Sequence, residues 1–216
     1  MPTWSVVVPA KQLASAKTRL TPLTASLAAD LPLGHEQLVL DLLADTVAAA
    51  LASSVVGRVL VVTDEPRAAA VVTALGADTT ADQPRNGLNA ALAHGAERAR
   101  ADGDGPVAAL NSDLPALRPE ELTAALTAAA GHGRSFVADA QGTGTTLLAV
   151  RDGALAPRFG PGSAAAHAAG GAVPLDGDWP GLRQDVDTPA DLLAASWIGV
   201  GARTAGFLSA TSWSPG

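Results

Sequence analysis

The chain has 216 residues, enough for one α/β domain with its own core, and 48% of them are apolar while only 3% are aromatic. A net charge of −7 without any basic run argues against a nucleic-acid partner, and the lack of cysteine excludes disulfides, thiolate catalysis and cysteine-based zinc sites. No apolar stretch is long enough to span a membrane, and no charged leader precedes the first strand-like run, so we expect a cytoplasmic protein.

Strand-like and helix-like segments alternate along the chain. Short apolar or β-branched runs predict strands at 4–8, 59–63, 77–80, 106–110, 134–138 and 145–150. Amphipathic spacing and end signals predict helices at 33–52, 65–75, 89–101, 119–130, a short stretch from residue 163, and 188–196, and 10–21 reads as a loop. This alternation predicts a single domain, 1–208, with a three-layer, mostly parallel α/β sheet, followed by a mobile tail at 209–216. Ligands of such sheets bind beyond the carboxyl ends of strands, where Pro9 and Asp113 both lie.

Two aspartates one residue apart form the most informative motif, in the run 183–188 (RQDVDT). If Asp185-Val186-Asp187 is extended, its two carboxylates face the same way with an apolar residue between them. Crowded carboxylates repel unless a cation neutralises them, and Asp113, at the end of another strand, would complete an oxygen-rich site suited to Mg²⁺. The alternative is three unrelated surface aspartates, two of which cap helices.

Three cations follow the first strand directly, where an open α/β sheet places its ligand. These are Lys11, Lys17 and Arg19, in a chain with only 14 lysines and arginines. A triphosphate requires such a charge, whereas a solvated basic loop is the alternative. No glycine-rich phosphate loop and no dinucleotide-binding fingerprint occurs.

Two glycine-containing segments follow in the second half of the chain. In 142–146 (GTGTT), glycines allow close backbone approach and threonine hydroxyls can donate to anionic oxygens, although a plain turn between strands explains the pattern equally. In 159–163 (FGPGS), Ser163 is expected to be the N-cap of a short helix, whose N-terminus either receives an anion or is simply capped. We assign the nearby His167 to packing, and the other histidines show no triad or metal spacing.

Six blocks together resemble a known family. The N-terminal P-x-K-x5-K-x-R-L, then 87–89 (GLN), 113–115 (DLP), 142–145 (GTGT), 159–163 (FGPGS) and 185–189 (DVDTP), occur in the order seen in the 2-phospho-L-lactate/phosphoenolpyruvate guanylyltransferases of coenzyme F-420 biosynthesis. The resemblance spans about residues 4–200 and implies a fold like that of the glycosyltransferase-A-type nucleotidyltransferases. The glycine-rich first loop of that wider group is replaced here by the lysine and arginine stretch. The alanine-rich composition resembles the actinobacterial branch, which is associated with phosphoenolpyruvate as acceptor.

The resemblance also implies roles for individual residues. It places Mg²⁺, as two ions, on Asp113, Asp185 and Asp187, and phosphoenolpyruvate on Thr145, Gly160 and Ser163. It directs Lys11, Lys17 and Arg19 to phosphates, with Lys17 and Arg19 stabilising the triphosphate as it splits, and it places Gly87 and Asn89 near the nucleotide.

The implied reaction joins GTP and phosphoenolpyruvate into enolpyruvyl-2-diphospho-5'-guanosine and releases pyrophosphate, with possible hand-over of the product to a downstream transferase. The alternatives are the same chemistry on 2-phospho-L-lactate or molybdopterin, and a non-catalytic nucleotide-binding regulator, which would have no need of the three aspartates.

Overall fold

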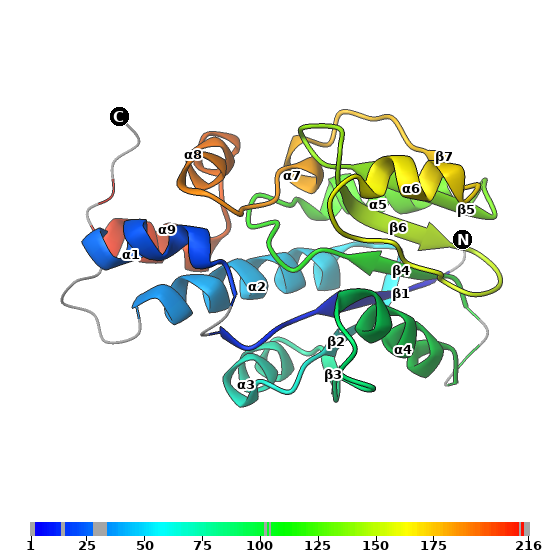
Figure 1. Cartoon of the computed structure of the whole chain (residues 1–216), viewed down its shortest axis with the longest axis horizontal. Helices are drawn as coiled ribbons and strands as arrows, with labels where there is room; N and C mark the ends of the chain where they lie inside the picture. Colours follow the sequence, from blue (N-terminus) through cyan, green and yellow to red (C-terminus); the bar gives the residue numbers. More distant parts are fainter. Residues whose placement is uncertain are drawn as a thin grey trace.

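A computed structural model describes residues 3–13, 16–27, 34–101, 103, 105–211 and 213. One seven-stranded sheet crosses the molecule in the order β3-β2-β1-β4-β6-β5-β7 (Figure 1). Its strands are β1 (Trp4–Pro9), β2 (Val56–Val62), β3 (Asp78–Thr80), β4 (Val107–Leu110), β5 (Arg134–Ala138), β6 (Thr145–Val150) and β7 (Val173–Pro174). Strands β3, β2, β1 and β4 run parallel, and β7 runs parallel to β5. Because only β6 opposes its neighbours, the expected mostly parallel sheet is confirmed.

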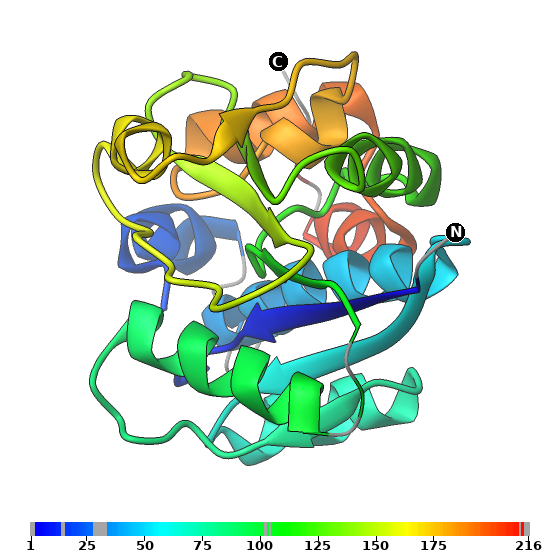
Figure 2. The ribbon, with the colours of Figure 1, turned by 90° about the vertical axis from the view of Figure 1, so that its right-hand side faces the viewer.

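Helices cover both faces of the sheet, which gives the expected three layers. Along β1, Val6 and Val8 point into the core shared with α2 (Gly34–Ala52), α3 (Pro66–Ala74) and α5 (Pro119–Ala129). The intervening Val7 points into the opposite core, against α4 (Leu88–Ala101) and α6 (Ser163–Ala169). Apolar residues on both sides of a strand are typical of a buried parallel strand. The two helical layers are seen on opposite sides of the strands in Figure 1 and, turned by 90°, in Figure 2.

Close packing of α4 on the sheet depends on a glycine. A Cβ on Gly95 would lie 2.5 Å from a methyl carbon of Val7 and 2.6 Å from one of Val62. Only a residue without a side chain lets this helix approach β1 and β2 so closely. Gly95 therefore allows α4 to pack directly against β1 and β2.

A third apolar cluster lies on the far side of α2 and was not expected from the sequence. It joins α2 to α1 (Thr21–Leu27), α8 (Pro189–Ile198) and α9 (Ala202–Ala210), grouped at the left of Figure 1. The α9 segment reads as a glycine- and serine-containing tail, yet it is helical because a distant side chain caps it. Asp45, on α2, accepts hydrogen bonds from the backbone N–H groups of Arg203 (3.1 Å) and Thr204 (2.8 Å). A carboxylate at free helix N–H groups stabilises the first turn.

This helix corrects the expected end of the domain. Residues 209 and 210 belong to α9 and Thr211 is buried, so the boundary placed at residue 208 is too early. The rest of the expected tail, apart from Trp213, lies outside the described residues. Four short elements were also missed: η2 (Thr18–Leu20), α1, α7 (Pro180–Arg183) and the two-residue β7. Within the described ranges, no helix combines the length and apolar character that crossing a membrane requires.

Candidate active site

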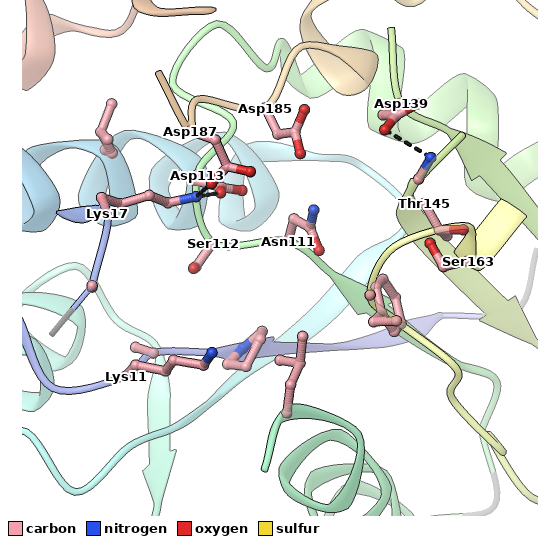
Figure 3. Close-up of a pocket in the computed structure, with 18 of the residues that line it drawn as sticks. Lys11, Lys17, Asn111, Ser112, Asp113, Asp139, Thr145, Ser163, Asp185 and Asp187 are labelled. Carbon is pink, nitrogen blue, oxygen red and sulfur yellow. Dashed lines mark hydrogen bonds and ion pairs between the residues drawn. The ribbon is translucent and has the colours of Figure 1, made fainter. Parts of the chain in front are cut away.

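A cavity of about 680 Å³ opens beyond the carboxyl ends of β1 and β4 (Figure 3). Lys17, Asp113 and Asp187 gather at one end, and Thr145 and Ser163 lie at the other. The residues along the floor between the two ends include Asn111 and Ser112, which follow β4 directly. The sheet therefore places its polar cavity where parallel strands end, as expected.

Lys17 is held between two carboxylates. Its ammonium contacts Asp113 Oδ2 closely and lies 2.6 Å from Asp187 Oδ1. Burial by itself lowers the pKa of Lys17, but the charges and hydrogen bonds of Asp113 and Asp187 outweigh it and raise this pKa above its ordinary value. The Lys17 backbone adopts the left-handed conformation (φ 54°, ψ 39°), which is uncommon outside glycine and marks a constrained position.

Asp113 is fixed by its own backbone. The N–H of the next residue, Leu114, donates to the buried hydroxyl of Thr46 on α2 (2.9 Å), and the carbonyl of Asp113 accepts from the N–H of Val186 (3.1 Å). The second contact ties the loop after β4 to the C-terminal pair of aspartates. The loop that carries Asp113 is therefore held beside the Asp185–Asp187 segment, which begins 72 residues later in the chain.

The Asp185-Val186-Asp187 segment is irregular rather than a strand, but its alternation holds. Val186 is fully buried in the third apolar cluster, and the two aspartates lie on the cavity side of it. Burial, followed by the charges of Asp113 and Asp187, raises the pKa of Asp185 to about 7, although Lys17 acts in the opposite direction. Asp187 is more open, with 55% of its side chain exposed. Its N–H donates to Asp191 Oδ2 (3.1 Å), in the first turn of α8.

The start of α8 has the expected form. Thr188 is its N-cap, Pro189 is its first residue, and the Thr188 and Asp191 side chains complete a reciprocal capping box. The rigid helix start therefore fixes the position of Asp187.

The three carboxylates are the kind of ligand that a hard cation prefers, but their side chains are not arranged around a common metal position. In the part of the chain that the structure describes, no three histidine, cysteine, aspartate or glutamate side chains are gathered closely enough to hold a metal ion. The Lys17 ammonium lies between Asp113 and Asp187 instead. However, Asp113 Oδ1 is buried and has no hydrogen-bond partner among the described residues. After burial, the nearby negative charges of Asp113 and Asp187 also raise the pKa of Asp185, which shows that the carboxylates repel one another. Oxygen donors in this state suit Mg²⁺, provided that Lys17 gives up a carboxylate contact.

The other two expected cations also line the cavity. Lys11 follows β1 and faces the aspartates from the opposite wall, and Arg19 lies in η2. Both side chains are exposed, and neither has an ion-pair partner among the described residues. They remain available to neutralise an anion.

The other end of the cavity is built on a tight turn between β5 and β6. Asp139 accepts hydrogen bonds from the N–H groups of Thr143 (2.9 Å) and Gly144 (2.8 Å). A Cβ on Gly144 would lie 2.3 Å from the Asp139 carboxylate, so a larger residue there would displace this carboxylate from its position in the turn. The turn delivers Thr145, the first residue of β6, to the cavity wall. Sequence reasoning did not single out Asp139, although an aspartate before a glycine-rich turn is a visible signal.

Gly160 and Ser163 line the same end, but Ser163 is not a cap. The N-cap of α6 is Gly162, with φ 71°, and Ser163 is the first helical residue. We expected its hydroxyl to bond the helix, whereas within the described chain it has no hydrogen-bond partner. The glycine accounts for the difference because it adopts the left-handed backbone that the turn needs without steric cost. The Ser163 hydroxyl is therefore free to bind a ligand.

His167 is packed, as expected, and it is also fully hydrogen-bonded. It is 3% exposed and lies between Phe136 and Phe159, with an edge-on ring contact to the latter at 5.3 Å. Nδ1 lies 2.9 Å from Thr145 Oγ1, and Nε2 accepts from the N–H of Arg158 (2.9 Å). Burial, then the charges of Arg134 and Arg158, lower the pKa of His167 to about 4.

The two residues expected near the nucleotide lie beside the cavity rather than in its lining. Gly87 and Asn89 sit at the start of α4 and are not among the residues that line the cavity, whereas their neighbour Leu88 is. The Asn89 amide binds both backbone groups of Phe159, donating to its carbonyl (3.0 Å) and accepting from its N–H (2.7 Å). Asn89 therefore anchors the wall at the Ser163 end, a contact that sequence spacing could not reveal.

Solved nucleotidyltransferase-like proteins share this fold. A protein from Desulfovibrio desulfuricans assigned as a nucleotide-diphospho-sugar transferase superposes with a TM-score of 0.71 over 98% of this chain and 96% of its own, at 18% identity. A 4-diphosphocytidyl-2C-methyl-D-erythritol synthase superposes with a TM-score of 0.61 over 92% of this chain and 99% of its own, at 14% identity. At these identities the likeness concerns the fold alone, and it agrees with the expected nucleotidyltransferase-like architecture.

Sequence relatives are much closer. The chain is 64% identical over 205 residues to the phosphoenolpyruvate guanylyltransferase of Geodermatophilus obscurus, covering 95% of this chain and 94% of the relative. It is 54% identical over 205 residues to the enzyme of the same name from Streptomyces coelicolor, covering 94% of each. The profile of the guanylyl transferase CofC-like family matches residues 4–174. On these grounds, the chain belongs to the guanylyl transferase CofC-like family.

Proposed function

We propose that this protein transfers the guanylyl group of GTP to phosphoenolpyruvate, as a step of coenzyme F-420 biosynthesis. The observation that carries the proposal is a cavity with two chemically different ends, in a chain 64% identical to a relative of that name. One end offers Lys11, Lys17 and Arg19 for a triphosphate. The other offers the hydroxyls of Thr145 and Ser163, beside Gly160, for a smaller anion.

The reaction is an in-line displacement at phosphorus. A phosphate oxygen of phosphoenolpyruvate attacks the α-phosphorus of GTP, one new P–O bond forms, and the bond to the β-phosphate oxygen breaks to release pyrophosphate. Lys17 and Arg19 would stabilise the negative charge on the leaving pyrophosphate. The attacking phosphate is already ionised near neutral pH, so no general base is needed. His167, neutral and with both ring nitrogens engaged, agrees with this.

Asp113, Asp185 and Asp187 would hold Mg²⁺, as two ions, which would screen the charge of the two anionic substrates. Before binding, Lys17 neutralises part of the same carboxylate cluster. On arrival of the nucleotide, the Lys17 ammonium would exchange a carboxylate oxygen for a phosphate oxygen.

Pyrophosphate release tests the proposal. The protein is incubated with GTP, Mg²⁺ and phosphoenolpyruvate, with pyrophosphatase present so that each pyrophosphate released is measured as two phosphates, and with the downstream transferase present to remove the nucleotide product. We expect pyrophosphate only when both substrates are present, and more slowly or not at all when ATP replaces GTP. Equal or faster release with 2-phospho-L-lactate would reassign the acceptor. No release with any acceptor, despite GTP binding, would favour a nucleotide-binding regulator.

A further inference from the structure

His167 is one of the most constrained polar side chains beside the cavity, and the reaction has no step for it. Each of its ring nitrogens has one hydrogen-bond partner. The partner of Nε2 is a backbone N–H, that of Arg158, which can only donate. Nε2 must therefore be the unprotonated nitrogen, and the proton of a neutral imidazole must lie on Nδ1. The backbone of Arg158 thus selects one tautomer of His167.

This tautomer decides the direction of the next hydrogen bond. Nδ1–H donates to Thr145 Oγ1 across 2.9 Å, so the threonine oxygen acts as the acceptor. A hydroxyl has one hydrogen, and the hydrogen of Thr145 must then point elsewhere. Among the described residues, Thr145 Oγ1 has no second protein partner, and the residue lines the cavity. The hydroxyl hydrogen is therefore presented to whatever occupies that end of the cavity.

The surroundings keep this arrangement in place. Burial and two nearby arginines hold the pKa of His167 at about 4, so the neutral ring persists at physiological pH. The Asn89 amide grips both backbone groups of Phe159, the residue after Arg158. Since Phe159 also packs edge-on against the imidazole, neither the ring nor the Arg158 N–H can turn without breaking other contacts.

We infer that His167 is a positioning residue: it holds the Thr145 hydroxyl as a hydrogen-bond donor aimed at the anionic group of the acceptor substrate. The inference rests on the proposed function for the identity of that anion. With the opposite tautomer, Thr145 would donate to the histidine and turn only lone pairs toward a phosphate or carboxylate, which would repel it. The Arg158 backbone thereby acts on acceptor affinity through two hydrogen bonds.

Paired substitutions separate positioning from structural support. His167→Asn places an amide N–H near the Nδ1 position and loses the Arg158 contact, whereas His167→Gln places an amide oxygen near the Nε2 position and loses the Thr145 contact. We expect the Asn variant to be less stable with a near-normal KM for phosphoenolpyruvate. We expect the Gln variant to keep its stability better while that KM rises roughly 10-fold or more, the loss typical of one hydrogen bond to a charged group. The KM for GTP should stay constant in both.

Threonine variants provide the matched control. Thr145→Val should raise the KM for phosphoenolpyruvate roughly 10- to 100-fold, and Thr145→Ser should restore it. Thr146→Val removes the neighbouring hydroxyl, which donates to the Val137 carbonyl and faces away from the cavity, and should leave both KM values unchanged. A KM for phosphoenolpyruvate that follows protein stability in all the variants would overturn the inference.

A measurement on the free protein separates this inference from the proposed function. Long-range ¹H–¹⁵N NMR spectra report which imidazole nitrogen carries the proton. We expect His167 to be neutral with its proton on Nδ1 from pH 5.5 to 8. A proton on Nε2 would overturn the inference whatever the acceptor is. If the wild-type enzyme used a different phosphorylated acceptor, the same KM comparison would be made with that substrate, and only the proposed function would fail.

Discussion

The two ends of the cavity are held in different ways. At the Thr145 end, buried hydrogen bonds connect His167 to Thr145 and Asn89 to Phe159, so the ligand-facing groups are fixed before any substrate arrives. At the Lys17 end, the exposed Lys11 and Arg19 line the same cavity as a carboxylate cluster, and Lys17 pairs with two of its members, Asp113 and Asp187. Under the proposed function, the acceptor end would be preorganised, whereas the nucleotide end would rearrange its ion pairs on binding.

Removing a carboxylate at the Lys17 end should have the largest effect. We expect Asp113→Ala, Asp185→Ala or Asp187→Ala to lower kcat/KM by about 10³-fold or more, because each loses a cation ligand and stabilisation of transition-state charge. Circular dichroism should show a folded protein in each case. The matched control is Asp152→Asn, an exposed carboxylate beyond the other end of β6 that pairs with Arg151, which should be neutral. Near wild-type activity of Asp187→Ala at saturating Mg²⁺ would remove the metal assignment.

Removing the charge of Lys17 should break the nucleotide end selectively. We expect Lys17→Met to reduce kcat/KM for GTP by about 10²-fold, with little change in the KM for phosphoenolpyruvate. Arg19→Met, at an exposed position without an ion-pair partner among the described residues, should have a smaller effect on the same parameter. Steady-state kinetics with each substrate varied in turn provides the check. Equal losses for both substrates would argue against two separate ends.

Ser163→Ala is the reciprocal experiment at the preorganised end. Loss of one hydrogen bond to a charged group, worth about 1.5–3 kcal/mol, should raise the KM for phosphoenolpyruvate roughly 10- to 100-fold and leave that for GTP nearly constant. Because Gly162 rather than Ser163 is the N-cap, the melting temperature should change little. A rise confined to GTP would place the acceptor elsewhere, and a drop in stability of about 1 kcal/mol would restore the capping role.

The smallest effect concerns acid stability. The folded pKa of His167, about 4, is below its ordinary value of 6.5, so the unfolded chain takes up the proton first as the pH falls. His167 therefore contributes stability above pH 6.5 that is lost progressively down to pH 4, about 0.5–1 kcal/mol of it between pH 7 and 6. Asp185, whose pKa is raised, acts in the opposite direction over the same range. The contribution of His167 is measured by determining the free energy of unfolding in urea at each pH for wild type and His167→Gln. If this free energy changes equally with pH in both proteins, the prediction is wrong.

Local signals in the sequence were sufficient for most of the fold. Apolar runs located six strands, and the proline and cap signals around Thr188 placed α8 to within two residues. The missed α9 depends on Asp45, which lies 158 residues before the N–H group of Arg203 that it caps, and no local pattern carries such a contact. The same limit applies to the short β7, which pairs at the sheet edge through its backbone.

The site shows a similar division. The aspartates, the cations, Thr145, Gly160 and Ser163 were expected in one cavity, and the structure brings them there. The roles of Asn89 and His167 were not visible, because each depends on the backbone of a segment distant in the chain. Residue type and order thus indicated which groups line the cavity, whereas the contacts that hold those groups in place became visible only in the folded chain.

The central claim is that a phosphate oxygen of phosphoenolpyruvate attacks the α-phosphorus of GTP within this cavity. Phosphoenolpyruvate carrying ¹⁸O in all its non-bridging phosphate oxygens tests it most directly, with ³¹P NMR and mass spectrometry of the products before any pyrophosphatase is added. We expect all the label in the guanosine diphosphodiester product, one ¹⁸O in its new bridge, and unlabelled pyrophosphate. Label in pyrophosphate, or formation of GMP with unchanged phosphoenolpyruvate, would contradict the account.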